Sequence, residues 1–284
     1  MRIFFKRRIE LSFVGILLFL SAVAAVMALP MVYLVSTAFK PIDELFIYPP
    51  TFFVRNPTTN NFASLLTAVT SSLVPFSRYL VNSIFVTGIS VFLILLICSM
   101  AAYPLAKMKF PGQGLIFKFI IISLMFAPEV TEIPKYILIS RLNIMNTYLV
   151  LTLPLLCFPI GVFLMKQFMD QIPDALYEAA KIDGANHAVI YWHITMPQVK
   201  PAWATVIILS FLAIWNDSGS SALYIQTERI KSLPFFLSTI SGQGVATVGA
   251  ASAASLLMLL PSVIIFLAFQ RQVISTMAYS GIKS

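Results

Sequence analysis

The polar side chains whose spacing best suits chemistry lie in one stretch, residues 172–200, of an otherwise apolar chain. If this stretch is helical, Asp174, Glu178 and Lys181 follow one another at i, i+4 and i+7 and share one face. Carboxylates and an ammonium group on one face can form ion pairs and charge-assisted hydrogen bonds. The spacing therefore indicates recognition of a partner.

No set of residues in the sequence indicates catalysis, a cofactor or a metal site. The segment G-x-x-x-x-G-K-[ST] is absent, so we do not expect a P-loop ATPase. Cys98 and Cys157 lie inside apolar runs, without the spacing of a zinc site or a redox motif. His187 and His193 are six residues apart, on different sides of a helix, which does not suit a metal. We expect no catalytic residue, metal or cofactor on this chain.

The composition places the chain in a membrane. Hydrophobic residues make up 59% of it, charged residues only 11%, and the mean hydropathy is +0.90. About a quarter of the residues of a soluble domain are charged. The net charge of +8 is scattered between apolar runs without a basic patch. This charge therefore indicates membrane topology and contact with anionic lipid, and it argues against nucleic acid as a partner.

Six apolar stretches are long enough to cross a bilayer as helices, which takes about 20 residues. They lie at about 11–39, 80–106, 115–138, 148–168, 202–225 and 250–269. Pro128 and Glu129 interrupt the third stretch. Further prolines predict kinks within or near the spans, at Pro104, Pro154, Pro159 and Pro261. The first stretch is longer than the apolar part of a signal peptide, so we expect an uncleaved anchor.

The basic residues predict the orientation of these spans. With the N-terminus in the cytoplasm, twelve of the nineteen Lys and Arg residues fall in cytoplasmic segments, as the positive-inside rule requires. We therefore predict an all-α integral membrane protein with six transmembrane helices and both termini in the cytoplasm. The polar stretch between spans four and five is then cytoplasmic.

The polar stretch is predicted to form two short helices. The first covers 172–181 and ends at Gly184, since glycine commonly terminates a helix. Asn186 can cap the second, over 187–195, which Pro197 is expected to end.

Helices this short are marginal alone in water, so these two must pack against the membrane spans on one side, and a partner can cover the other. The alternative is an ordinary loop at the membrane surface, with Tyr191 and Trp192 as aromatic anchors.

The same stretch resembles the EAA loop of ABC-importer membrane subunits, the permeases. The matching residues are Glu178, Ala179, Ala180, Asp183, Gly184, Ile194 and Pro197, with Met196 where the family usually has Leu. Without Asp183 these are six specified positions, and six in this spacing recur by chance at about one site in 10⁷.

The resemblance covers about residues 79–284 and is similar to the carbohydrate-importer branch, in particular the smaller permease of maltose-type transporters. The further matching segments are 79–83, 134–143, 146–148, Pro154, 250–252, 260–261, 269–271 and 280–283. One departure follows Trp215 and Asn216, where 217–221 replaces the family's acidic residue and aromatic-rich stretch.

The resemblance implies several partners in a bacterial cell membrane. In this family the EAA loop forms coupling helices that enter a cleft of a cytoplasmic ATPase dimer, which binds ATP and Mg. A second, different permease subunit, an extracytoplasmic solute-binding protein and a sugar or oligosaccharide substrate are also implied. Residues 1–78 would form an anchor helix with the first external loop, and 79–284 the transport core with the EAA loop at about 172–200.

The resemblance also assigns roles within the loop. Glu178 would make a polar contact with the ATPase, and Gly184 would form the turn between the coupling helices. We expect Ile190, Tyr191 and Trp192 to be the apolar anchors, because buried aromatic side chains dominate most interfaces.

Asn216 and Asp217, near the outer end of span five, are candidates for the translocation pathway, because polar groups within membranes often mark pathways. The alternative for both is a helix-end contact with solvent or the partner permease.

Two other functions fit the sequence less well. An ion-coupled secondary transporter would want a carboxylate in mid-membrane, which none of the 11 acidic residues clearly provides. An ABC permease for a non-carbohydrate solute is disfavoured by the matching segments.

Overall fold

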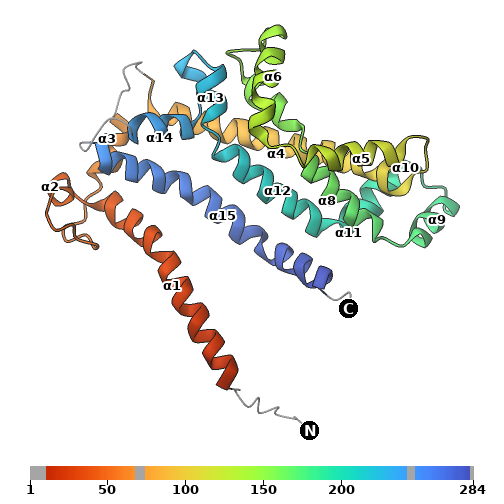
Figure 1. The fold of residues 1–284 in the computed structure, drawn as a ribbon, viewed down its shortest axis with the longest axis horizontal. Coiled ribbons are helices and arrows are strands. Elements are labelled where there is room, and N and C mark those ends of the chain that lie inside the picture. Colours follow the sequence, from red (N-terminus) through yellow and green to blue (C-terminus); the bar gives the residue numbers. More distant parts are fainter. Residues whose placement is uncertain (1–10, 68–73, 242–246, 282–284) are drawn as a thin grey trace. The chain divides into compact units, whose positions relative to one another are not determined.

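The computed structural model (Figure 1) describes residues 11–67, 74–241 and 247–281, and these residues form helices without a strand. The long helices are α1 (Leu11–Phe39), α4 (Phe76–Lys107), α12 (Lys200–Trp215) and α15 (Val248–Gly281). Shorter ones are α2 (Ile42–Leu45), α3 (Asn60–Thr67), α5 (Gln113–Ser123), α6 (Pro128–Arg141), α7 (Tyr148–Thr152), α8 (Pro159–Asp170), α13 (Gly219–Tyr224) and α14 (Leu233–Ser241), with 3₁₀ turns η1 (Leu153–Leu156) and η3 (Glu228–Ile230). The all-helical prediction is confirmed for these residues.

Three helices within the described ranges are long and apolar enough to cross a membrane: Phe13–Phe39, Phe76–Lys107 and Val248–Gln272. Two further spans are possible as bent pairs of helices. Tyr148–Leu156 and Pro159–Asp170 meet at 42°, and His187–Gln198 and Lys200–Trp215 meet at 78°. The first bend lies where Pro154 and Pro159 predict a kink.

Besides the bent fourth span, two more predicted spans differ in the structure from single helices. The third is divided into α5 and α6, and α6 begins at Pro128, where the break is predicted. The fifth ends at Trp215, and α13 starts a separate helix at Gly219. Asn216 and Asp217 lie between α12 and α13, and these residue types favour the end of a helix over its continuation. A total of six spans stays a prediction.

The chain forms two compact units. The first unit, Met1–Thr67 with Ile240–Leu257, contains α1, whose side chains are exposed over residues 13–33, as a lipid-facing helix requires. The loop after α1 is held by side-chain hydrogen bonds. Glu44 is buried and accepts a hydrogen bond from the backbone N–H of Arg55 at 2.7 Å, and Asn61 donates to the carbonyl of Ala38 at 2.9 Å.

The second unit, Ala68–Thr239 with Met258–Ser284, is built around α4, which packs against α8 and α12. Its core is apolar and includes Val86, Ile94, Cys98, Ala102, Val150, Met165, Met169, Ala202 and Val206. Close contact between α4 and α8 requires a glycine at position 161. A Cβ atom there would lie 2.8 Å from the Sγ atom of Cys98 and 2.8 Å from a ring carbon of Phe158.

We predict that Gly161→Ala destabilises the protein by about 1–3 kcal/mol, because overpacking a close helix contact forces neighbouring atoms to shift. The measurement is the midpoint of thermal unfolding of the purified full-length chain in detergent. Gly88→Ala is the matched control, because a Cβ at Gly88 of α4 meets nothing within 4 Å. Equal midpoints for the two variants would contradict the assigned packing.

Candidate functional site

The polar stretch folds into a loop of four helical segments between α8 and α12, which we call the polar loop (residues 172–198). The segments are α9 (Asp174–Ile182), α10 (His187–Val189), the π-helical η2 (Ile190–Thr195) and α11 (Met196–Gln198). The two predicted short helices are therefore present, the second as a continuous run of α10, η2 and α11. The predicted end at Pro197 is wrong. Pro197 lies within this run, just after the π-helical η2, where the regular i→i−4 bonding that a proline would break is already altered. The run ends at Gln198, and the bend to α12 follows one residue later.

The turn between the two helices is formed by Gly184, as predicted. Its φ angle of +82° lies in the left-handed region that favours glycine. The backbone N–H of Ala185 donates to the carbonyl of Ala180 at 2.9 Å, and that of Gly184 donates to Lys181 at 3.1 Å. This pair of bonds is a Schellman motif, which closes the end of α9. Asn186 then caps the next helix by accepting a hydrogen bond from the N–H of Val189 at 2.9 Å.

The inner side of the polar loop is closed by buried side chains. The hydroxyl groups of Tyr177 and Thr195 lie 3.0 Å apart and join α9 to η2. Ile190 is fully buried and Tyr191 is 7% exposed. Burial raises the pKa of the Tyr177 phenol, against the opposing effect of its hydrogen bond with Thr195, so the phenol stays protonated at neutral pH.

Two polar contacts join the second helix of the polar loop to α4. The hydroxyl groups of Tyr191 and Ser99 lie 2.6 Å apart in a buried position. Further along α4, the hydroxyl group of Tyr103 lies 3.2 Å from Nδ1 of His187, and its ring packs edge-on against that of Tyr191 at 5.5 Å.

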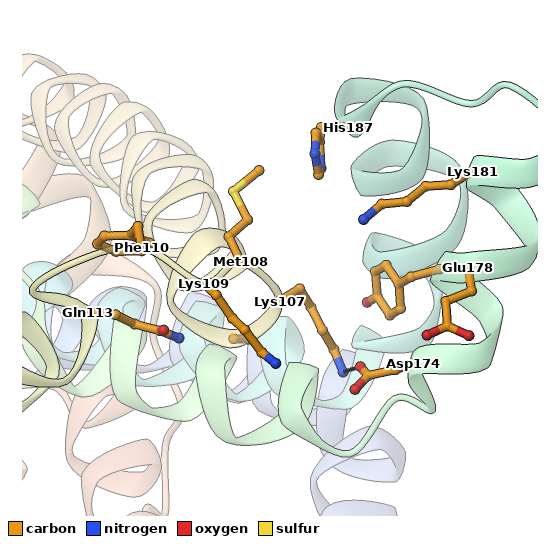
Figure 2. Close-up of a pocket in the computed structure, with 11 residues that line it drawn as sticks. Lys107, Met108, Lys109, Phe110, Gln113, Asp174, Glu178, Lys181 and His187 are labelled. Atoms are coloured by element: carbon orange, nitrogen blue, oxygen red, sulfur yellow. Dashed lines mark hydrogen bonds and ion pairs between the residues drawn. The ribbon is translucent and has the colours of Figure 1, made fainter.

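A third contact joins α9 to the end of α4 through Lys107 (Figure 2). Its Nζ atom donates to the carbonyl of Ile172 at 2.6 Å and to the Asp174 carboxylate at 2.8 Å. The same ammonium group lies 4.9 Å from the centre of the Tyr177 ring, which is a cation–π contact. The Lys107 side chain is only 7% exposed, whereas that of Asp174 is 79% exposed.

The hydrogen bond and positive charge of Lys107 lower the pKa of Asp174. Asp174 is therefore ionised at neutral pH, and the ion pair is lost only as the pH falls through that lowered pKa.

An open pocket of about 910 Å³ lies between the end of α4 and α9 (Figure 2). Its lining is mixed in charge and comprises Ala106, Lys107, Met108, Lys109, Phe110, Gln113, Asp174, Tyr177, Glu178, Lys181 and His187. Within the described ranges no group of three His, Cys, Asp or Glu residues could hold a metal ion. The pocket is suited to charged side chains of both signs from a partner.

The residues expected to contact an ATPase divide between the surface and the interior. Exposed are Glu178, Ala179, Asp183, Gly184, Trp192 and Pro197; Ile194 is half-buried, and Ala180 and Tyr191 are buried. The expectation that Ile190 and Tyr191 anchor a partner directly is therefore wrong for this conformation, because both face the interior of the chain. Trp192 stays available at 53% exposure.

Sequence reasoning missed two apolar residues of this surface. Ile182 is 86% exposed and Leu176 is 44% exposed. An isoleucine directly before the Asp183–Gly184 turn was the available signal, since a residue beside a helix-ending turn is poorly placed to reach the core.

Asn216 and Asp217 lie at the other end of α12 and are not brought together with the polar loop. Asn216 is exposed and donates to the carbonyl of Leu212 at 2.8 Å, within its own helix end. Asp217 is half-buried and accepts a hydrogen bond from the N–H of Ser220 at 3.1 Å, which starts α13. Asp217 also lines a cavity of about 20 Å³ with hydroxyl groups that include Ser83 and Thr87.

Comparison with known proteins supplies the context for this geometry. The profile of the family described as "Binding-protein-dependent transport system inner membrane component" matches residues 2–279. The chain is similar to "Putative ABC transporter permease protein ORF2" of Caldicellulosiruptor sp. (strain Rt8B.4), with 31% identity over 268 residues that cover 94% of this chain and 95% of that protein.

Another relative is "Arabinooligosaccharides transport system permease protein AraQ" of Halalkalibacterium halodurans, 29% identical over 92% of this chain and 93% of that protein. Among solved structures, a chain of a bacterial ABC transporter involved in the import of the acidic polysaccharide alginate has the same fold. The TM-score is 0.81 at 20% identity, covering 94% of this chain and 98% of that chain.

We predict that Gly184→Ala loosens the polar loop, because a left-handed conformation costs an alanine about 1–2 kcal/mol. Hydrogen exchange of the α9 amides should accelerate by about 5–30-fold, measured by mass spectrometry on the full-length protein. Gly184→Asn should exchange nearly as slowly as the parent protein, because asparagine tolerates this region and does so here at Asn143 and Asn146. Gly114→Ala is the control, at a glycine without positive φ and with open space around it. Unchanged exchange in Gly184→Ala would show that the turn does not hold the loop.

Proposed function

Because the chain belongs to the family of binding-protein-dependent transport system inner membrane components, we propose that it is a permease subunit of an ATP-driven importer for a sugar or oligosaccharide. It would form half of the translocation pathway, beside a second, different permease. The substrate class is supported by the arabinooligosaccharide permease relative and the fold shared with an alginate importer. An ion-coupled transporter and a permease for a non-carbohydrate solute are not favoured by these relatives.

The observation that carries the proposal is the shape of the polar loop. It has a closed, hydrogen-bonded inner side and an exposed tip that presents Glu178, Ile182 and Asp183. A short helical tip of this kind can enter a cleft of a partner subunit, because its own contacts already hold it in shape. The proposed partner is a cytoplasmic ABC ATPase dimer, which would bind ATP and Mg and carry out hydrolysis.

The loop residues would then have two kinds of role. Glu178 would make the polar contact with the ATPase, with Asp183 beside it and Gly184 forming the tip. Trp192 would supply an apolar contact at the rim. The remaining matched residues would act in the following ways: Ala179 and Pro197 as surface contacts, and Ala180, Tyr191 and Ile194 as the packing that supports the surface.

We propose the predicted topology for the assembled protein, with six spans, both termini in the cytoplasm and the anchor region 1–78 preceding the core 79–284. The protein would lie in a bacterial cell membrane. In this topology α5 and α6 together supply the third span, and the polar loop faces the ATPase.

On the outer side, an extracytoplasmic binding protein would deliver the substrate, as the family description implies. We propose that Asn216 and Asp217 lie beside the outer part of the pathway, on the basis of the polar cavity that Asp217 lines.

The test is Glu178→Ala in the complete transporter reconstituted in proteoliposomes. Uptake driven by ATP should fall about tenfold or more, because removal of one partner of a buried interface charge pair typically costs about 2 kcal/mol or more, and about 1.4 kcal/mol already corresponds to tenfold. Co-purification of the ATPase should weaken in parallel. Asp170→Ala is the matched control, since it removes an acidic side chain that pairs locally with Lys166 and lies outside the tip. Normal uptake and normal ATPase binding by Glu178→Ala would refute the proposed contact.

A further inference from the structure

We propose that a stripe of three α4 side chains, Ser99, Tyr103 and Lys107, transmits movement of the polar loop to α4, and that Lys107 is the positioning residue that orients α9. This inference rests on the proposed function, because it assumes that an ATPase moves the loop. It adds to that function a specific path from the ATPase contact into one membrane helix.

The three residues are spaced at i, i+4 and i+8, so they lie on one face of α4. Each of them contacts a different part of the polar loop. Ser99 contacts η2, Tyr103 contacts α10, and Lys107 contacts α9 and Ile172, two residues before α9. The loop is thus attached to α4 along about two turns of one helix face.

Few side chains attach the polar loop to α4. Of the side-chain hydrogen bonds found within the described ranges, those that join the polar loop to α4 involve these three residues. The other bond from the loop to a long helix is that of Trp203 in α12, whose Nε1 donates to the carbonyl of Met196 close by in the chain. Movement of α9 therefore acts on α4 through these side-chain hydrogen bonds, in addition to the connection through the chain that joins α9 to α8.

Lys107 is the residue that sets the direction of α9. Its buried ammonium group has three kinds of partner, the carbonyl of Ile172, the carboxylate of Asp174 and the ring of Tyr177. These partners lie on both sides of the start of α9, before it and within its first turn. A helix bound at its first turn by a buried ammonium group cannot rotate without breaking charge-assisted hydrogen bonds.

The far end of α4 is attached in the same manner to the segment 228–233. Asn82 donates to the carbonyls of Arg229 at 2.8 Å and Lys231 at 2.9 Å, and Ser83 accepts from the N–H of Leu233 at 2.7 Å. α4 is unbroken over 32 residues, or about 48 Å. A displacement at Lys107 can therefore reach the opposite end of the unit through one helix.

The first experiment compares Lys107→Met, Lys107→Arg and Lys166→Met in the complete transporter in proteoliposomes. Lys166 is a matched control, because it too has an ion pair, with Asp170 at 2.6 Å, and a cation–π contact, with Phe117 at 4.4 Å, yet it does not contact the polar loop. Substrate transported per ATP hydrolysed should fall about tenfold in Lys107→Met, while basal ATP hydrolysis continues. Lys107→Arg should retain about half or more of the wild-type ratio, and Lys166→Met should match the wild type.

A purely structural role for Lys107 would lower the amount of assembled transporter and leave the ratio of transport to hydrolysis unchanged. That result, or a wild-type ratio in Lys107→Met, would overturn the inference while leaving the proposed function intact. Absence of ATP-driven uptake in the wild type would instead overturn the proposed function, and the inference with it.

The second experiment needs no destabilising variant. Spin labels are placed on cysteines introduced at the exposed positions Ala175 of α9 and Met100 of α4. The exposed Cys157 is replaced by Ser, and Cys98 is kept because it is fully buried. The distance between the labels should change by less than about 2 Å between nucleotide-free and ATP–vanadate-trapped transporter. A change of several ångströms would mean that the loop moves over α4 and would overturn the inference, whatever the behaviour of Lys107→Met.

Discussion

Polar groups near the apolar helices of this chain must find partners within the protein, because lipid supplies none. Both ends of α4 satisfy this requirement with a side chain that binds the carbonyls of a segment distant in sequence. Lys107 does so for Ile172, and Asn82 for Arg229 and Lys231. These bonds place the irregular segments against the ends of the helix. The positions of the polar loop and of the opposite segment both depend on them.

The same requirement explains the unusual distribution of side chains in the polar loop. Two tyrosines lie inside, where hydroxyl partners satisfy them, Tyr177 with Thr195 and Tyr191 with Ser99. Large apolar side chains such as Ile182 are left outside. An exposed apolar group beside charged residues, on a loop closed by its own hydrogen bonds, is the composition expected of a surface that a partner covers. The buried side chains thus hold the polar loop in its shape, and the exposed side chains are free to contact a partner.

Local features of the polar loop could be predicted from the sequence, and tertiary ones could not. The Gly184 turn and the Asn186 cap follow from backbone preferences of single residues, so both predictions are confirmed. The burial of Tyr191 beside an exposed Trp192 depends on which side of the second helix packs against α4, and the sequence of the loop alone does not determine this. The role of Lys107 lies in contacts about 65 residues away in the chain, which no spacing rule on α4 indicates.

The three attachments to α4 differ in their exposure to water. This difference separates the contacts that hold the polar loop on α4 from the contact that orients α9. The contact of Ser99 with Tyr191 is buried, whereas the Lys107 pair joins a buried ammonium group to an exposed carboxylate. Exposed ion pairs contribute little stability, because water and salt screen them. Removing Lys107 would therefore leave the loop attached through Tyr191. The fixed orientation of α9 would be lost. A helix that transmits a displacement from the ATPase depends on its orientation more than on the free energy of its attachment to α4.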